Sequence, residues 1–335
     1  RLRSASPSSA EDARRVLQGS SWTGSAQGSS SDWITDMKKI IALLTLSAVV
    51  MLTGCGENDQ SVPTEIIVDG SGTPEDSAGV FPVKLADGTV IDHSPDSIAS
   101  LSPAATEIIA ELGFGGRLCA VSRYCDFPEG ICTVTVGSSE NPDIDRITEL
   151  SPEVLFTLTP LAEREEYALE SAGITVVELE SPDSAEAYGN LYGTIATVFG
   201  GEEAGKSAAE KAVESLKSAA QGVTLGDFLY VSPKLTAAGS GIFENAMLSL
   251  CGNNMCSADG YTSSAEDISG APQYIIAADS LTAADITGSE LLSGFAADAD
   301  MIFVPAERFE RPSARISEVF TAIREQLSDT AQTAE

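Results

Sequence analysis

Residues 202–220 read Glu-Glu-Ala-Gly-Lys-Ser-Ala-Ala-Glu-Lys-Ala-Val-Glu-Ser-Leu-Lys-Ser-Ala-Ala, a segment that repeats apolar side chains at four-residue intervals. The repeated positions are Ala204, Ala208, Ala212, Leu216 and Ala220. Glutamate and lysine occupy the other faces, and glycines at 200–201 and 222 mark the two ends. The pattern predicts one amphipathic helix of 19 residues, about 28 Å long at 1.5 Å per residue.

Short apolar segments typical of strands alternate with helical patterns on both sides of this helix. Before it, strands are expected at 97–101, 118–121, 134–137, 154–158 and 175–179, and helices at 104–112, 145–150, 163–172 and 185–199. After it, strands are expected at 228–231, 274–277 and 301–304, and helices at 242–250 and 316–327. Asp87-Gly88 predicts a hairpin, and Ser102-Pro103 supplies an N-cap and a first-turn proline. This alternation is typical of mostly parallel sheets with a ligand crevice at the carboxyl ends of the strands.

These patterns predict an α/β protein with two Rossmann-like lobes joined by the long helix. The lobes are expected at 80–200 and 223–335, with the connecting helix at 201–222. One stiff connector permits only a small hinge, so a ligand would be held in a largely preformed cleft between the lobes. The alternative that periodicity leaves open is a single doubly wound sheet in which 202–220 is one crossover helix among many.

The segment from Met37 to Cys55 has the three parts of a secretory signal. Two lysines precede an apolar stretch at 40–52, which is too short to cross a bilayer as a stable helix of about 20 residues. Leu52-Thr53-Gly54-Cys55 resembles a bacterial lipobox, which implies a lipoprotein signal peptide at 37–54 and lipidation of Cys55. A buried helix that happens to end in a cysteine is the alternative.

Two neighbouring stretches are excluded from the predicted fold. Residues 1–36, rich in Ser, Gly and Ala, precede the methionine that begins the signal and are interpreted as a non-native upstream extension. Residues 55–79 are polar and are expected to form a flexible tether. We therefore expect an extracytoplasmic monomer, held by lipid at the outer face of the cytoplasmic membrane or in the periplasm.

Charge and residue counts exclude several classes of function. The 335 residues include 50 acidic and 19 basic ones, and the formal charge of −31 would repel nucleic acid. His93 is the only histidine, so a multi-histidine metal centre cannot be built, and we expect neither a metal site nor a cofactor. The cysteines after Cys55 leave two alternatives, a small loop closed by Cys251 and Cys256 or a set of reduced thiols. The other members of the set are Cys119, Cys125 and Cys132.

An ordered series of motifs gives the chain a resemblance to a known family. Its first half contains Ser97-Ile-Ala-Ser-Leu-Ser-Pro-Ala-Ala-Thr-Glu-Ile-Ile-Ala-Glu-Leu-Gly, Arg123-Tyr-Cys-Asp-Phe-Pro, Asn141-Pro-Asp-Ile-Asp-Arg-Ile and Leu150-Ser-Pro-Glu-Val-Leu. Its second half contains Gly239-Ser-Gly-Ile-Phe and Phe309-Glu-Arg-Pro-Ser-Ala-Arg-Ile. In this order, residues 81–328 resemble the helical-backbone substrate-binding proteins of ABC importers, which deliver cobalamin, ferric siderophores and haem. The cobalamin-binding type is the most similar, through Tyr-Cys-Asp-Phe-Pro and Glu-Arg-Phe-Glu-Arg-Pro.

The resemblance implies a class III periplasmic-binding-protein fold and a small-molecule ligand between the lobes. A corrinoid is the expected ligand, with a ferric siderophore or haem as the alternative. Such ligands present flat apolar faces and a polar rim, which require aromatic contact and a few placed hydrogen bonds. The residues that fall at ligand-binding positions are Tyr124, Asp126, Glu140, Tyr261, Glu307, Arg308 and Phe309. The cobalamin-binding relative carries tryptophans where this chain has Glu140, Tyr261 and Arg308.

The resemblance also implies an ABC permease and its ATPase as partners. One acidic residue of each lobe, Asp145 and Glu266, falls at the position that pairs with permease arginines, and Asp143 and Asp267 are the nearest substitutes. Exposed ion pairs contribute about 0–1 kcal/mol each, so they would set orientation more than affinity.

Two other classes of function compete with import. The first is a secreted enzyme, but Gly239-Ser240-Gly241 is not a Gly-x-Ser-x-Gly nucleophile elbow. The glycine-rich stretch Gly113-Phe-Gly-Gly follows a predicted helix rather than a strand, so it does not fit a dinucleotide-binding motif. We therefore expect no enzymatic activity. The other competitor is a lipid-anchored sensor or adhesion module with the same fold.

Overall fold

The structure is a computed structural model that describes residues 80–132 and 134–333. The expected upstream extension (1–36), signal peptide (37–54), lipidation site Cys55 and tether (55–79) lie outside the described residues. Within the described ranges, no helix is both long enough and apolar enough to cross a membrane.

Four parallel strands form the first sheet, in the order β4-β3-β7-β8. Their bounds are Ile98–Ser100 for β3, Leu118–Val121 for β4, Val154–Thr157 for β7 and Thr175–Glu178 for β8. Ile98 of β3 stands opposite both Leu118 and Val154. β3 and β7 are buried along their whole length, as expected for parallel strands covered on both faces.

Short helices connect these strands: α2 (Pro103–Glu111), η2 (Gly115–Arg117), α3 (Ile144–Leu150) and α4 (Glu163–Ser171). The expected start of α2 is confirmed, because the Ser102 side chain accepts a hydrogen bond from the Ala105 amide at 3.2 Å and Pro103 is the first helical residue. The hairpin predicted at Asp87-Gly88 is also present, as β1 (Val83–Lys84) paired with β2 (Val90–Ile91).

The strand expected at 134–137 is only partly formed. Thr135 makes an isolated parallel bridge with Val121, whereas β5 (Gly137–Ser138) pairs antiparallel with β6 (Asn141–Pro142). Gly137 has φ 83°, and a Cβ there would lie 2.4 Å from the Asn141 carbonyl oxygen. The tight turn that this glycine permits therefore diverts the chain from the sheet.

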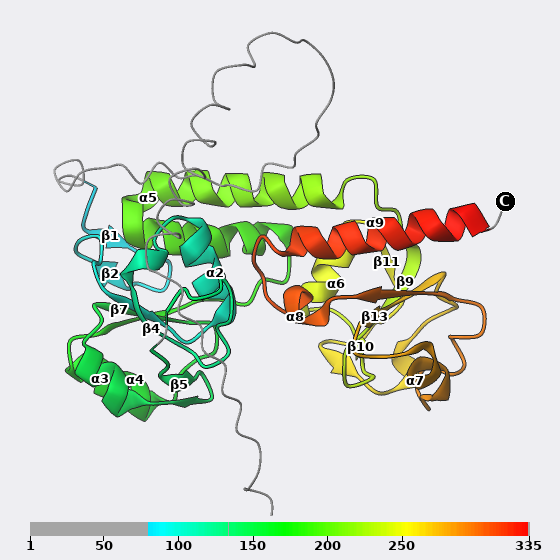
Figure 1. The fold of residues 1–335 in the computed structure, drawn as a ribbon, viewed down its shortest axis with the longest axis horizontal. Helices are drawn as coiled ribbons and strands as arrows, with labels where there is room; N and C mark the ends of the chain where they lie inside the picture. The colour runs from blue at the N-terminus through cyan, green and yellow to red at the C-terminus, as the bar shows by residue number, and fades with distance from the viewer. Residues whose placement is uncertain (1–79, 133, 334–335) are drawn as a thin grey trace, which may run out of the picture. The chain divides into compact units, whose positions relative to one another are not determined.

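The element α5 (Ala185–Ala220) contains the segment expected to connect the two lobes. Gly201 interrupts it with φ 79° and ψ −177°, so 185–200 and 202–220 are two helical arms that run antiparallel, as Figure 1 shows. The helix predicted at 202–220 is confirmed, and the predicted glycine pair marks its beginning. The arms approach closely, since a Cβ on Gly189 would lie 2.6 Å from Val213 Cγ2 and one on Gly205 would lie 2.7 Å from the Gly193 carbonyl oxygen.

The second sheet has the order β12-β10-β9-β13-β14, and β11 also pairs with β9. The bounds are Gly226–Val231 (β9), Ala237–Ala238 (β10), Gly252–Asn254 (β11), Tyr261–Thr262 (β12), Tyr274–Ala278 (β13) and Asp300–Val304 (β14). β11, β13 and β14 are parallel to their neighbours, whereas β10 is antiparallel to β9. The two main sheets share no strand among the described residues, so the single-sheet alternative is wrong and the predicted α/β architecture of two lobes is confirmed.

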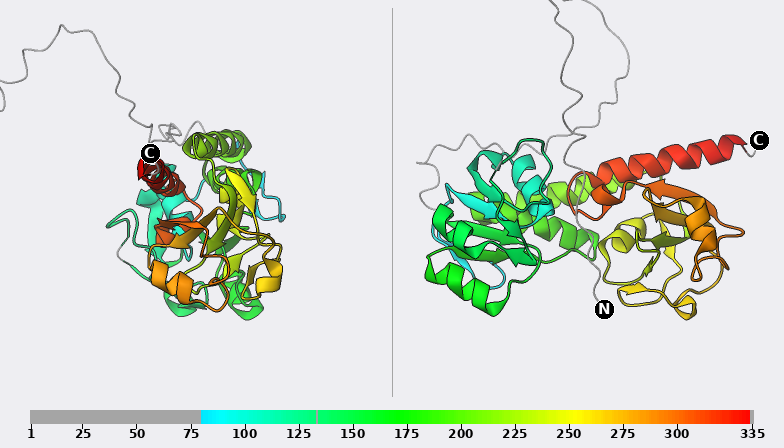
Figure 2. Two further views of the ribbon diagram at one scale, coloured as in Figure 1. Left: turned by 90° about the vertical axis from the view of Figure 1, so that its right-hand side faces the viewer. Right: turned by 60° about the horizontal axis from the view of Figure 1, so that its bottom comes forward.

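Helices of the second half are α6 (Phe243–Leu248), η3 (Ala265–Asp267), α7 (Ala283–Gly288), α8 (Ala306–Phe309) and α9 (Ile316–Thr333). α9 lies alongside α5, as Figure 2 shows. Arg324 of α9 donates hydrogen bonds to the Ala219 carbonyl at 2.7 Å and the Gln221 carbonyl at 3.1 Å. It thereby satisfies carbonyl groups that the end of α5 leaves unpaired.

Candidate functional site

A pocket of about 350 Å³ lies where residues of both halves meet, a volume typical of small-molecule sites. The first half contributes residues that follow β3, β4 and β7, together with Ser139 of the β5-β6 turn. The second half contributes residues after β14. The lining residues are Leu101, Ser102, Pro103, Ala104, Tyr124, Ser139, Leu158, Thr159, Glu307, Glu310, Arg311 and Pro312. The pocket therefore lies at the carboxyl ends of parallel strands, where the sequence predicted a crevice.

Tyr124 and Arg311 bring an aromatic ring and a cation to this pocket. Tyr124 is 58% exposed, and the Arg123 guanidinium carbon lies 5.4 Å from the centre of its ring. Arg311 donates to the Tyr124 carbonyl at 3.4 Å and forms ion pairs with Asp126 and Glu107. Its hydrogen bond to Asp126 holds the pKa of that carboxyl below its ordinary value. Asp126, which was predicted to bind the ligand, forms an ion pair with Arg311 in this structure.

The predicted residues of α8 have three different surroundings. Glu307 is exposed and lines the pocket. Arg308 forms an ion pair with Glu318 of α9 and is not among the lining residues. Phe309 is fully buried, with its ring edge-on to Tyr230 at 5.2 Å, so it packs in the core rather than on the pocket surface. Consecutive residues of one helical turn point in different directions, which explains the separation.

Tyr261 belongs to a polar cluster in the second half. Its hydroxyl donates a hydrogen bond to Glu244 Oε1 at 3.1 Å, and Glu244 is 5% exposed. Burial raises the pKa of Glu244 to about 7, although the hydrogen bond from Tyr261 opposes the shift. The Tyr230 hydroxyl is buried without a hydrogen-bond partner among the described residues. Its pKa is raised mainly by this burial and, to a smaller extent, by the nearby charge of Glu244.

The remaining predicted residues lie on the surface. Glu140 is exposed in the β5-β6 turn, next to the pocket residue Ser139. Asp145 is exposed in the first turn of α3, and Glu266 is exposed in η3. Asp143 and Asp267, the alternative docking residues, already have partners within the protein. Asp143 caps α3 by accepting a hydrogen bond from the Arg146 amide at 3.1 Å, and Asp267 accepts one from the Thr262 hydroxyl at 2.5 Å.

Cysteine is not among the residues that line this pocket. The five described cysteines are free, so the loop that Cys251 and Cys256 could have closed is not formed. Burial raises the pKa of Cys251 to about 11 and also raises the pKa of Cys125, which keeps both thiols protonated at neutral pH. The described residues contain no group of three His, Cys, Asp or Glu side chains arranged to hold a metal ion.

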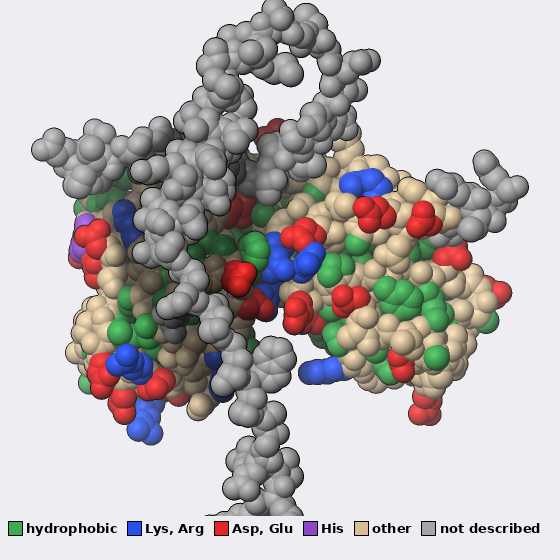
Figure 3. All heavy atoms as spheres, viewed as in Figure 1, with side chains coloured by type: hydrophobic (Ala, Val, Ile, Leu, Met, Phe, Trp, Pro, Cys, Tyr) green, Lys and Arg blue, Asp and Glu red, His purple; other side chains and the backbone are tan. Residues whose placement is uncertain are grey.

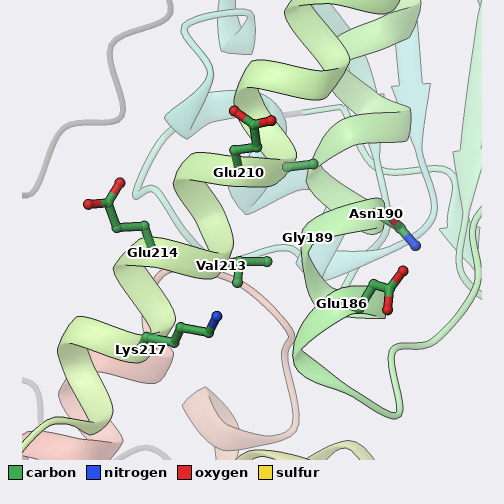
Figure 4. A pocket seen from close by; sticks show the side chains of 8 residues that line it. Glu186, Gly189, Asn190, Glu210, Val213, Glu214 and Lys217 are labelled. Carbon is green, nitrogen blue, oxygen red and sulfur yellow. The ribbon is translucent and has the colours of Figure 1, made fainter.

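A second hollow, of about 470 Å³, lies between the two arms of α5 (Figure 4). Its lining combines the small or apolar residues Gly189, Ala209 and Val213 with charged ones such as Glu186, Glu210 and Lys217. The small residues that bring the arms together account for this groove. Of these two hollows, the smaller one combines an exposed aromatic ring with polar groups from both halves, as small-molecule sites do.

Of the residues that line the pocket, only Tyr124 and Glu307 were predicted, and the charged residues Glu310 and Arg311 were missed. Both occur in the quoted motif Phe309-Glu-Arg-Pro-Ser-Ala-Arg-Ile, so part of this motif lines the pocket. A clue was present in Arg311, a cation immediately before a proline in a strongly acidic chain. Burial raises the pKa of Glu310, as expected for a carboxyl held at the edge of a pocket.

Residues 98–304 match the periplasmic binding protein family, and the chain belongs to that family. Two curated relatives are YvrC of Bacillus subtilis (strain 168), described as an uncharacterized ABC transporter substrate-binding lipoprotein, and a cobalamin-binding protein of Halobacterium salinarum (strain R1). YvrC is 27% identical over 181 residues, or 52% of this chain and 54% of YvrC, so the chain spans about half of that relative. The Halobacterium protein is 22% identical over 280 residues, or 73% of this chain and 76% of that protein.

A solved structure supports the fold independently. The periplasmic haem-binding protein HutB of Vibrio cholerae superposes with a TM-score of 0.60, at 18% identity, over 69% of this chain and 98% of HutB. At this identity the likeness establishes the architecture alone.

Proposed function

We propose that this chain is the substrate-binding lipoprotein of an ABC importer and that it captures a corrinoid in the pocket between its halves. One observation carries the proposal: Tyr124 of the first half and Glu307, Glu310 and Arg311 of the second line the same pocket. A ligand in this position contacts both halves at once, as expected for a site between the two lobes of a binding protein. We assign the chain no reaction on its ligand.

The chemistry of the pocket supports a ligand with an apolar face and a polar rim. The exposed ring of Tyr124 offers a stacking surface, and Leu101 and Leu158 add apolar contact. Glu307 and Glu310 accept hydrogen bonds from amide N–H groups, while Arg311 donates to carbonyl or phosphate oxygens. A corrinoid carries amides around its ring, and relatives of this chain in Halobacterium and Yersinia are named as cobalamin- or vitamin B12-binding proteins.

A ferric siderophore or haem is the second candidate. Arg311 favours it, because a guanidinium binds the carboxylates of such ligands with two parallel hydrogen bonds. Without the tryptophans of the cobalamin-binding type, the pocket also offers less stacking surface to a corrin ring.

The proposal includes export, a lipid anchor and two docking residues. Lipidation at Cys55 and the tether at 55–79 would hold the folded part outside the cytoplasmic membrane. Asp145 and Glu266 are exposed, one on each half, as docking to the arginines of a permease requires. Exposed pairs of this kind orient the complex more than they stabilise it.

Titration of the purified chain with cyanocobalamin, cobinamide, haemin and ferric chelates tests the ligand. We expect saturable binding by calorimetry and a rise in Tm for cobinamide or cyanocobalamin, because a ligand present at 100 times its Kd adds about 2.7 kcal/mol to the free energy of unfolding. Binding of haemin or a ferric chelate alone would move the assignment to the second candidate. If none binds at micromolar concentration, the proposed ligand class is wrong.

A further inference from the structure

Three side chains of the second half converge on one carboxylate of the first half. Glu107 Oε1 lies 3.2 Å from Arg311 Nη1 and 3.2 Å from Arg315 Nη1, and Ser313 donates to Glu107 Oε2 at 2.6 Å. The Glu107 side chain is 3% exposed, and the two arginines are 16% and 17% exposed. We call Glu107, Arg311, Ser313 and Arg315 the Glu107 cluster. It joins the segment after β14 to helix α2.

Neighbouring contacts fix the same segment at further points. Glu111, one helical turn after Glu107, accepts hydrogen bonds from the Ala314 backbone and from the Tyr192 hydroxyl, the latter at 2.7 Å. The Arg315 guanidinium lies 4.4 Å from the centre of the Phe127 ring, on the loop that carries Tyr124 and Asp126. Residues 311–315 are therefore attached both to α2 and to this loop.

Arg311 has two acidic partners with different surroundings. Glu107 is buried, and removing one partner of a buried, hydrogen-bonded ion pair is strongly destabilising. Asp126 is 60% exposed, and exposed ion pairs are weak and easily replaced by other groups. An acceptor group of a ligand can therefore replace Asp126 while Glu107 keeps the guanidinium in place.

We infer that Glu107 is a positioning residue of the ligand pocket, although it does not line the pocket itself. It orients Arg311, and through Arg315 and Ser313 it sets the spacing of the two pocket walls. The inference rests on the proposed function for the identity of the pocket. The preorganised guanidinium would favour ligands that present an acceptor oxygen at this wall, since no side-chain ordering is then required on binding.

Hydrogen exchange of the ligand-free chain tests the attachment. In Glu107→Gln, we expect the amides of 313–316 to exchange about tenfold faster than in the wild type, because the segment loses its buried ionic partner on α2. The matched control is Glu149→Gln, which removes an exposed ion pair with Arg146 on α3 and should leave these amides unchanged. Since Glu107→Gln removes the buried carboxylate that Arg311 and Arg315 share and can impair folding, Ser313→Ala, which retains every charge, should give a smaller increase at the same amides. Unchanged exchange in both variants overturns the inference, whether or not any ligand binds.

A double-mutant cycle tests whether Glu107 acts through Arg311. With cyanocobalamin and haemin as probes, we expect Glu107→Gln to weaken the binding of whichever probe the wild type binds by about tenfold. The double variant with Arg311→Gln should bind no more weakly than Arg311→Gln alone, because the second substitution removes nothing further. Additive losses would show that Glu107 only stabilises the fold, and would overturn its positioning role. If the wild type binds no probe, the proposed function fails and the exchange measurement alone decides the inference.

Discussion

Glu244 shows how burial creates a titratable group in this protein. Its carboxyl is almost completely enclosed and receives a hydrogen bond from Tyr261, and no cation forms an ion pair with it among the described residues. The charged form is therefore penalised, and the pKa rises from 4.5 to about 7. By contrast, the buried carboxylate Glu107 has two arginine partners. Burying a carboxylate without a cationic partner is costly, and Glu244 lacks the partners that Glu107 has.

Replacing Glu244 with Gln should flatten the dependence of stability on pH. The raised pKa of Glu244 means that its contribution to stability is fully present below pH 4.5 and is lost as the pH rises through about 7. The expected loss is about 3 kcal/mol, because each tenfold difference in proton affinity between the folded and unfolded states corresponds to about 1.4 kcal/mol. Urea unfolding of the wild type and Glu244→Gln at pH 5 and pH 8 measures it, with Glu149→Gln as the control that keeps the wild-type slope. If the free energy of unfolding of Glu244→Gln changed with pH as steeply as that of the wild type, the prediction would be wrong. Some dependence on pH should remain in this variant, because burial also raises the pKa of Glu111 and Glu310.

At the scale of elements, the reversal of α5 depends on one glycine. Gly201 has φ 79°, and a Cβ there would lie 2.0 Å from Val80 Cγ1. Both the backbone conformation and the space beside it require glycine. Because this turn sends 202–220 back along 185–200, it sets the course of the helix that leads into the second sheet.

Gly201→Ala should destabilise the protein by about 1–3 kcal/mol from backbone strain, with a further cost from the contact with Val80. Gly288→Ala is the matched control: its Cβ would meet nothing within 4 Å and its φ is not positive, so its stability should change by about 0.5 kcal/mol or less, or rise slightly. Chemical denaturation of both variants compares them. Equal stability of the two would show that the reversal does not need glycine.

The sequence predicted most elements because their signals are local. Ser102-Pro103 started a helix as expected, and the four-residue repeat at 202–220 formed one side of a helix. The Glu107 cluster was beyond such reasoning, because Glu107 and Arg315 are 208 positions apart and only the fold brings them together. For the same reason, the sequence located the segment at 309–316 but did not separate buried Phe309 from pocket-lining Arg311.

At the scale of the whole chain, negative charge is the dominant property. The formal charge is −31, and acidic side chains are spread over the visible face, with a group of basic side chains near its centre (Figure 3). Like charges repel one another in the compact state, so this excess opposes folding while it keeps the protein soluble.

Raising the NaCl concentration from about 0.01 M to about 1 M should increase Tm, because the Debye length falls from about 30 Å to about 3 Å and repulsion among surface carboxylates is screened. Differential scanning calorimetry measures the change in Tm, with sucrose as a control for effects that do not depend on charge. A fall in Tm with NaCl would mean that ion pairs such as Arg146–Glu149 outweigh the repulsion.

The attachment of 311–315 to α2 has a mechanical consequence for the two halves. The chain crosses from one sheet to the other through the second arm of α5, and the ionic contact at Glu107 joins the halves at another place. The rings of Tyr188 and Phe243, 6.2 Å apart, add a further contact between the first arm of α5 and α6. Rotation of one half against the other would have to separate these contacts as well as bend the helix, so the walls of the pocket are held at a nearly constant spacing.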